Sequence, residues 1–359
     1  MPALAGPDWR ARVAKRSGTA ARPRRTPAPV SARRALAVGR RLADEVLRFR
    51  DRALRRRTAA IRRAAPAAEE RAVSPRLIRA AGAGPGGVAR TGVLVAEGDS
   101  WFDYPWHDVL RMLEDHHGYD IESVAHKGDS VESMAYGGQL EELTRLVEKL
   151  LRQGVLPSAI LLSGGGNDVA GNEFRVLIDH VRSAHAGLND QVVRGIIDQR
   201  VFDAYVTILA GVTMVCRQRT GRPVPIIIHG YAHPVPDGRG VLGGWGLLPG
   251  PWLQPGFRDK GFSAPDACVE MAADLIDRFN VMLRRVAALT EFRHVRYVDV
   301  RDLLSNAADY KTWWANELHP TKRGFEAVAE RFAAAISPSV GSAFRRTNPA
   351  KAGSHGSRG

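Results

Sequence analysis

Short apolar runs alternate with helical patterns from residue 93 onward in this 359-residue chain. Runs rich in Val, Ile and Leu are typical of buried strands, and apolar residues that repeat every three or four positions are typical of amphipathic helices. Such alternation predicts a parallel sheet with helices on both faces. The expected strands are 93–97, 120–125, 159–163, 224–229 and 295–299, and the expected helices are 106–116, 138–152, 172–184, 191–220, 266–290 and 322–336.

Positive charge is concentrated ahead of this pattern. Residues 1–92 hold 23 Lys and Arg against 6 Asp and Glu, whereas the rest of the chain holds 29 against 32. The basic character therefore belongs to the N-terminal part and says nothing about a substrate. We expect a disordered basic tail over 1–30, where Ala, Arg and Pro dominate, and a second disordered tail over 339–359.

Residues 31–90 are predicted to form an arginine-rich amphipathic helix followed by a Gly-rich linker. Ala35, Val38 and Leu42 recur at helical spacing and give the helix an apolar stripe. The stripe docks on the chain's own domain, or residues 31–64 make a weak contact with an anionic membrane or acidic polymer. Aromatic residues suited to base stacking are nearly absent, so we favour docking and expect no specific nucleic-acid recognition.

Membrane and redox signals are weak. About 18 consecutive apolar residues would be needed for a transmembrane helix, and the chain offers no such run. Arginines interrupt every candidate for a secretory signal, so we expect a cytoplasmic protein. The two cysteines, Cys216 and Cys268, cannot make a disulfide framework and are expected to be buried thiols.

Ser100 stands at the end of the first expected strand. Gly98-Asp99 breaks the apolar run 93–96 sharply, which places Ser100 at the carboxyl edge of the sheet, ahead of a helix. Open parallel sheets carry their chemistry at that edge. A serine in this position is either a helix cap or a nucleophile, and a nucleophile needs a base and oxyanion donors.

Three further stretches occur in a fixed order after Ser100, and each lies at a strand end or in a loop. They are Ser-Val-Ala-His-Lys-Gly-Asp-Ser at 123–130, Leu-Leu-Ser-Gly-Gly-Gly-Asn-Asp at 161–168 and Asn-Glu-Leu-His-Pro-Thr at 316–321. Together with 97–101 they resemble the four sequence blocks of the SGNH hydrolases, also called GDSL esterases and lipases. The resemblance spans 93 to about 337. It implies a flavodoxin-like three-layer α/β/α sandwich with about five parallel strands, and a hydrolase domain over 91–338.

The resemblance also implies a role for each matching residue. Ser100 matches the nucleophile and His319 the base. The oxyanion hole would use the N–H groups of Ser100 and Gly128 and the side chain of Asn167. The implied activity is hydrolysis of a carboxylic ester through an acyl-enzyme, and no metal or organic cofactor is implied.

The chain departs from the family at the residue that orients the base. The family commonly has Asp three residues before the histidine, where this chain has Asn316. An amide oxygen can accept the imidazole hydrogen bond but cannot stabilise imidazolium by charge. Three candidates stay open: Asn316 itself, which position favours, the neighbouring carboxylate of Glu317, and Asp299 at the end of the fifth strand.

Residues 231–265 form a long aromatic loop after the fourth expected strand. A loop of this length is commonly functional, and its aromatic side chains need burial. It covers the substrate pocket or packs on the domain flank. On the first alternative the pocket includes Trp101, His233, Trp245 and Trp252. The aromatic residues favour an apolar acyl or aryl ester.

Two rival functions share these residues. The first is a non-catalytic or weakly catalytic binding protein that the basic arm tethers to a membrane or an acidic polymer. Asn316, in place of the usual Asp, keeps this hypothesis open. The second is an acyltransferase that uses Ser100 and His319 but delivers the acyl group to an alcohol.

Overall fold

A computed structural model describes residues 25–64, 91–241 and 249–336. Most of the predicted N-terminal tail, the Gly-rich linker, Trp245 and the predicted C-terminal tail lie outside these residues. No helix in the described ranges is both long and apolar enough to cross a membrane.

Five parallel strands form the central sheet, in the order β2-β1-β3-β6-β7. Their bounds are β1 Gly92–Glu97, β2 Tyr119–Ser123, β3 Ala159–Leu162, β6 Ile226–His229 and β7 Val295–Val298. β1, β3 and β6 lie inside the sheet, and the last two are buried along their whole length. The predicted parallel sheet is confirmed, because such continuous Ile and Leu runs require cover on both faces.

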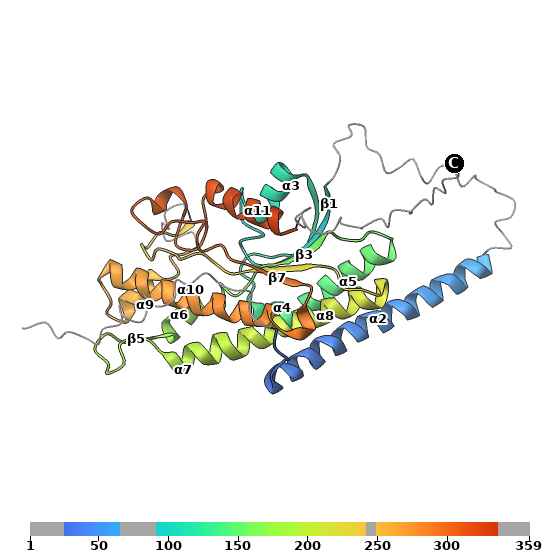
Figure 1. The fold of residues 1–359 in the computed structure, drawn as a ribbon, viewed down its shortest axis with the longest axis horizontal. Helices are drawn as coiled ribbons and strands as arrows, with labels where there is room; N and C mark the ends of the chain where they lie inside the picture. The colour runs from blue at the N-terminus through green and yellow to red at the C-terminus, as the bar shows by residue number, and fades with distance from the viewer. Residues whose placement is uncertain (1–24, 65–90, 242–248, 337–359) are drawn as a thin grey trace, which may run out of the picture.

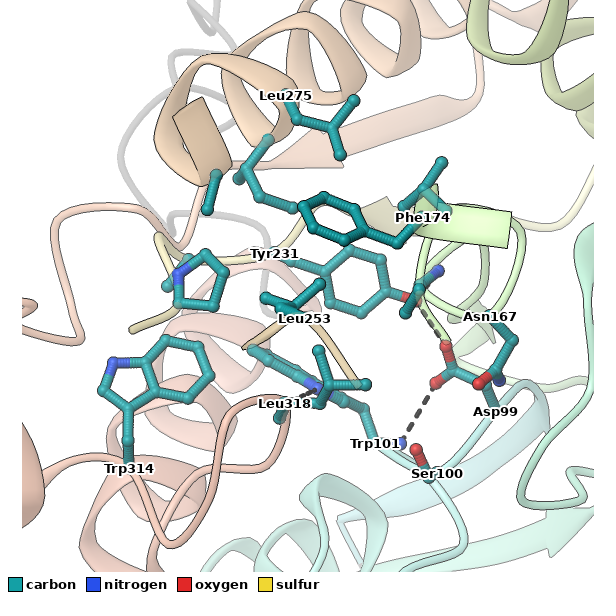
Figure 2. Close-up of a pocket in the computed structure, with 17 residues that line it drawn as sticks. Asp99, Ser100, Trp101, Asn167, Phe174, Tyr231, Leu253, Leu275, Trp314 and Leu318 are labelled. Carbon is teal, nitrogen blue, oxygen red and sulfur yellow. Dashed lines mark hydrogen bonds between the residues drawn. The ribbon is translucent and has the colours of Figure 1, made fainter. Parts of the chain in front are cut away.

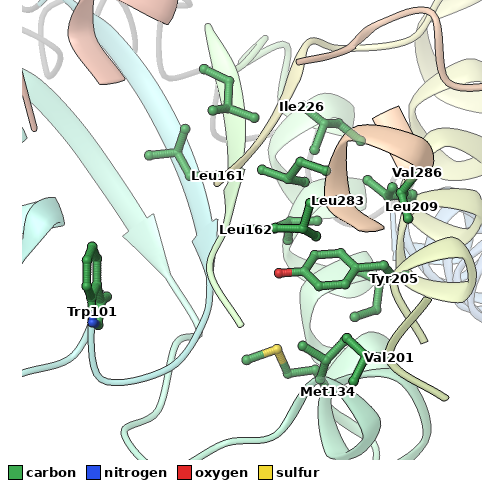
Figure 3. Packing of buried hydrophobic residues seen from close by; sticks show 14 of the residues in the cluster. Trp101, Met134, Leu161, Leu162, Val201, Tyr205, Leu209, Ile226, Leu283 and Val286 are labelled. Carbon is green, nitrogen blue, oxygen red and sulfur yellow. The ribbon is translucent and has the colours of Figure 1, made fainter. Parts of the chain in front are cut away.

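Helices cover both faces of this sheet (Figure 1). α3 and α11 lie together on one face, and α4, α5, α8 and α10 pack on the other. On the second face, Leu162 and Ile226 lie on the same side of the sheet as Tyr205 and Leu283 in the core (Figure 3). The three-layer prediction is thus confirmed. The bounds are α3 Val109–His117, α4 Val131–Tyr136, α5 Gln139–Arg152, α8 Phe202–Thr220, α10 Pro265–Ala287 and α11 Lys322–Ile336.

Several expected helices have different bounds. The helix predicted over 172–184 ends at Val176, and a small antiparallel pair follows it. After Val176 the backbone leaves the helix, and Ile178 pairs with Leu188 and Asp179 with Gly187, whose φ of +113° no right-handed helix contains. The remaining elements are α6 Asn172–Val176, β4 Ile178–Asp179, β5 Gly187–Leu188, α7 Asp190–Val193, a π-helix Arg194–Val201, α9 Gln254–Asp259, and 3₁₀ turns Thr290–Phe292 and Tyr310–Thr312.

The arginine-rich arm forms α2, Val30–Ala64, and packs across α8 and α5 as an outer layer (Figure 1). α8 is apolar all round, so the side that faces away from the sheet also needs cover. The two helices approach closely at Gly39, where an added Cβ would lie 2.1 Å from the carbonyl oxygen of Thr207. The apolar stripe of α2 is therefore used within the chain, as its periodicity predicts, and most of its arginines are exposed.

A buried carboxylate strengthens this contact. Glu148 of α5 is fully buried, and its oxygens lie 3.0 Å from Arg219 of α8, 3.4 Å from Arg152 and 3.6 Å from Arg50 of α2. Arg219 also pairs with Asp51 of α2 at 2.8 Å. The three guanidinium groups compensate the buried charge of Glu148, and they remain partly exposed to water.

Residues 25–29, which we expected in the disordered tail, are ordered. Thr26 donates from its N–H to the carbonyl of Ala288 at 3.0 Å and accepts from Thr290 at 2.9 Å. The Arg25 guanidinium also donates to the carbonyl of Phe292 at 3.0 Å. Residues 25–29 thus depart from the prediction, because their backbone groups find partners just after α10.

Candidate active site

Ser100 lies in a tight turn immediately after β1. Asp99 organises this turn: its Oδ1 accepts from the N–H of Trp101 at 3.0 Å and from the Ser163 hydroxyl at 2.8 Å. Its Oδ2 accepts from the hydroxyl of Tyr231. Burial raises the pKa of Asp99. Since its partners come from the ends of β3 and β6, the turn that presents Ser100 is tied to two neighbouring strands.

Two loops separated by more than 200 residues bring the nucleophile and the base together. The Ser100 Oγ lies 2.8 Å from Nε2 of His319, and Nδ1 of His319 lies 2.9 Å from Oδ1 of Asn316. Trp101, beside Ser100, donates from its indole N–H to the carbonyl of Leu318 at 3.0 Å. The two loops are therefore joined next to the reacting atoms.

Backbone N–H groups fix which atom donates and which accepts in the hydrogen bonds that link Asn316, His319 and Ser100. The N–H groups of Leu318 and His319 donate to Oδ1 of Asn316 at 3.0 and 2.9 Å. A backbone N–H can only donate, so the atom it meets must be the amide oxygen and not the amide nitrogen. Oδ1 then requires a proton on Nδ1 of His319, which leaves Nε2 free to accept from the hydroxyl of Ser100. This is the tautomer that a general base needs.

Aromatic rings enclose the base. The ring of Tyr104 is stacked on that of His319, with centroids 4.2 Å apart and planes 18° apart, and Trp252 meets it edge to face at 5.3 Å. His319 is only 4% exposed. Burial lowers the pKa of His319 to about 3, so the imidazole is neutral and able to accept a proton at ordinary pH.

Glu317 does not contact the base. Its carboxylate accepts four backbone N–H groups from the 231–265 loop, those of Gly238, Trp252, Leu253 and Gln254, at 2.6 to 3.0 Å. The residue is fully buried. Because all four donors belong to the loop, Glu317 holds the loop against the site, and it is Asn316 and not the alternative Glu317 that contacts His319.

Asp299 and His233 are also engaged elsewhere. Asp299 pairs with Arg301, whose guanidinium donates to Asp277 at 2.7 Å. Asp277 in turn lies 2.8 Å from Nε2 of His233. These residues form a separate polar cluster, so the structure contradicts Asp299 as the acid, and His233 does not line the pocket beside Ser100.

The second and third blocks are joined to each other. Gly128 lies in a turn with φ +91°, a conformation that favours glycine. Asn167 donates from Nδ2 to the carbonyl of Asp129 at 2.9 Å, and Asp168 accepts from the N–H of Val131 at 2.8 Å. Burial raises the pKa of Asp168 to about 6. The contacts hold the Asn167 side chain beside the Gly128 turn.

A pocket extends from Ser100 and Asn167 between α6, α10 and the aromatic loop (Figure 2). Its walls away from Ser100 are almost entirely apolar. Trp101 lines this pocket, whereas Trp252 contacts the ring of His319. Trp314, two residues before Asn316, also lines the pocket and was not predicted. The other apolar lining residues are Val169, Ala170, Phe174, Ala232, Pro234, Leu253, Ala272, Leu275, Ile276 and Leu318.

Metal ligands are not gathered anywhere in the described ranges: no group of three or more His, Cys, Asp or Glu side chains there could hold an ion. Cys216 and Cys268 are both buried free thiols, as expected.

No protein-family model and no curated protein matches this sequence. Among solved structures, a lipase from a goat rumen metagenome is 16% identical with a TM-score of 0.44, over 68% of this chain and 97% of its own. An acetylxylan esterase from Geobacillus stearothermophilus is 14% identical with a TM-score of 0.38, over 69% and 94%. A member of the lipolytic G-D-S-L family from Veillonella parvula is 14% identical with a TM-score of 0.37, over 67% and 94%.

Proposed function

We propose that this chain is a serine hydrolase of the SGNH type that cleaves carboxylic esters through an acyl-enzyme. The observation that carries the proposal is the continuous hydrogen-bonded chain from Asn316 through His319 to Ser100, with contacts of 2.9 and 2.8 Å. Its direction leaves Nε2 of His319 unprotonated and facing the serine hydroxyl. A helix-capping serine would have no need of a buried histidine in that tautomer.

In the first half of the reaction, the Ser100 Oγ attacks the ester carbonyl carbon while its proton passes to Nε2 of His319. The C–O bond forms as the carbonyl π electrons move to the oxygen. The tetrahedral intermediate collapses when His319 returns the proton to the departing alcohol. Water then repeats the sequence on the acyl-enzyme and releases the acid and free Ser100.

The negative oxygen of the intermediate would be held by the N–H groups of Ser100 and Gly128 and by the amide of Asn167. One hydrogen of the Asn167 amide is used by the Asp129 carbonyl at 2.9 Å. The second hydrogen remains for the substrate. The fixed first contact would make Asn167 a preorganised donor, which is what oxyanion stabilisation requires.

The pocket beside Ser100 favours an ester with an apolar acyl or aryl group. Its walls contain Phe174, Leu275 and Ile276, and among the residues that the structure describes only Asp99 brings a charged side chain to its lining. The oxygens of Asp99 are already occupied by Trp101, Ser163 and Tyr231. A charged acyl group would lose its hydration there without gaining a partner.

A fluorophosphonate probe with mass-spectrometric site assignment tests the proposal. We expect an adduct on Ser100 in the wild-type protein, none in Ser100→Ala, and strongly slowed labelling in His319→Ala. His233→Ala is the matched control and should label at the wild-type rate, because His233 contacts Asp277 and not the base. A folded wild-type protein that takes up no probe would contradict the proposal and favour the binding-protein alternative.

Nitrophenyl esters of increasing acyl length test the substrate class. We expect activity to rise from acetyl to longer apolar chains. Ala272→Phe should remove that rise and spare the acetyl ester, because residue 272 lines the wall away from Ser100. Adding an alcohol acceptor separates hydrolase from acyltransferase: a transferase would form the new ester in preference to the acid.

A further inference from the structure

If the proposed function holds, the positive charge that His319 gains during the reaction has no carboxylate beside it. His319 becomes an imidazolium when it takes the proton from Ser100, yet its Nδ1 contacts the neutral amide of Asn316 and not a carboxylate. It is nearly buried. In the part of the chain that the structure describes, the candidate acids Glu317 and Asp299 bind other groups. The cation therefore needs another source of stabilisation.

Tyr104 is the residue placed to supply it. Its ring lies on the imidazole with centroids 4.2 Å apart and planes inclined by only 18°. The face of an aromatic ring carries partial negative charge, which attracts a cation held over it within about 6 Å. This attraction would be weak for neutral His319 and would strengthen as the ring gains its proton. It would therefore act on the transition state more than on the resting enzyme.

The phenol of the same residue contacts the partner of the base. Nδ2 of Asn316 donates to the Tyr104 hydroxyl at 3.1 Å. Burial raises the pKa of Tyr104, so the phenol stays neutral and can accept. The contact holds the amide nitrogen away from His319 and supports the oxygen-inward orientation that the backbone of Leu318 and His319 also demands.

We propose that Tyr104 is a positioning residue that replaces the missing carboxylate of this triad: its ring stabilises the imidazolium of His319 and its hydroxyl fixes the amide of Asn316. The proposal rests on the proposed hydrolase function. It differs from simple packing because the two polar partners lie at the two ends of one side chain. Packing alone would require neither a stacked ring nor a hydroxyl facing an amide.

Graded fluorination of the ring tests the electronic part of this proposal. Tyr104→Phe keeps the ring, and phenylalanines that carry one to three fluorine atoms at position 104 weaken the negative face with little change in volume. We expect kcat/KM for a nitrophenyl ester to fall stepwise along the series. The complete loss of the ring in Tyr104→Leu should cost about 3- to 30-fold. Tyr136→Phe is the control, because the Tyr136 hydroxyl contacts Thr207 at 3.3 Å and not the base or Asn316.

A second variant separates charge compensation from structural support. If Tyr104 replaces a carboxylate, Asn316→Asp should relieve the need for it, and Tyr104→Leu should then cost less than about 2-fold in that background. Equal losses in both backgrounds together with a flat fluorine series would overturn the proposal. Failure of the wild-type protein to react with fluorophosphonate would instead contradict the hydrolase function, so the two failures are distinguishable.

Discussion

The loop that carries the base and the α2 arm are both packed on the same domain, but different forces hold them. Residues 314–319 are held by buried polar atoms whose hydrogen bonds have fixed directions, above all the amide of Asn316 and the carboxylate of Glu317. α2 is held by an apolar stripe, a close helix contact at Gly39 and ion pairs around Glu148. Directional contacts set geometry to fractions of an ångström, whereas apolar contacts and ion pairs mainly set stability. Changes in the first region should therefore alter turnover, and changes in the second should not.

The largest effect is expected at Glu317. Glu317→Ala leaves four buried N–H groups of the aromatic loop without their acceptor. Unfolding free energy should fall by about 3 kcal/mol. Displacement of Trp252 and Leu253 should lower kcat/KM by about 100-fold. Urea unfolding and ester kinetics measure both quantities.

Two related variants make this test specific. Glu317→Gln keeps one oxygen and should fall between wild type and alanine in both measurements, which keeps the test valid if the alanine variant does not fold. Glu122→Gln, at an exposed glutamate of β2, is the control and should change neither. Unchanged turnover in Glu317→Gln and Glu317→Ala would show that the loop does not set the geometry of the site.

On the acid side, kcat/KM should persist to lower pH than in an enzyme whose catalytic histidine has an ordinary pKa. Burial lowers the pKa of His319 to about 3, and the base works only above its pKa, so activity should be lost only as pH falls toward that value. At pH 5 an unperturbed histidine would have lost about 30-fold, whereas this protein should lose less than about 2-fold. The measurement is a profile of kcat/KM from pH 5 to 8.

In Asn316→Asp, kcat/KM should begin to fall at a pH closer to neutral, because a carboxylate at Nδ1 stabilises the imidazolium and raises the pKa of His319. Circular dichroism at each pH separates loss of activity from loss of fold. A wild-type limb near pH 6.5 would show that His319 is more hydrated than the buried geometry implies.

A smaller effect, on stability alone, is expected where α2 crosses α8. In Gly39→Ala the new methyl group would lie 2.1 Å from the carbonyl oxygen of Thr207, so the helices must separate. We expect a loss of about 2 kcal/mol in unfolding free energy with unchanged kcat/KM. Gly195→Ala is the matched control, since a Cβ there meets nothing within 4 Å, and it should be neutral or stabilising by about 0.5 kcal/mol. Lost activity in Gly39→Ala would couple the arm to the site.

The smallest effect is expected on the outward face of α2. Arg33, Arg34, Arg41 and Arg56 are exposed, and their combined replacement by Gln should change unfolding free energy by less than about 0.5 kcal/mol per site, without altering turnover. Retention on phosphatidylserine vesicles at low salt measures whether this face also contacts anionic surfaces. Equal retention of wild-type and substituted protein would argue against such a contact.

Much of the fold was predictable because it is local. The Ile and Leu runs of β3 and β6 and the apolar repeat of α11 lie close to their predicted positions. The helix expected over 172–184 was wrong because the same apolar residues suit a buried hairpin, and spacing does not separate the two. The cover of α8 by α2 was predicted only as docking on the domain, since periodicity reveals an apolar face but not the surface that it meets.

At the site, the sequence by itself determined which side chains stand at the strand ends: Ser100 after β1 and the Asn316 to His319 segment near the C-terminus. It favoured Asn316 by position as the partner of the base but left Glu317 and Asp299 open, because all three are near in sequence or topology. Only the tertiary structure decided among them. The backbone path directs the N–H groups of Leu318 and His319 at Asn316 and the loop N–H groups at Glu317. Hydrogen-bond direction depends on how distant segments pack, and that information is not contained in local spacing.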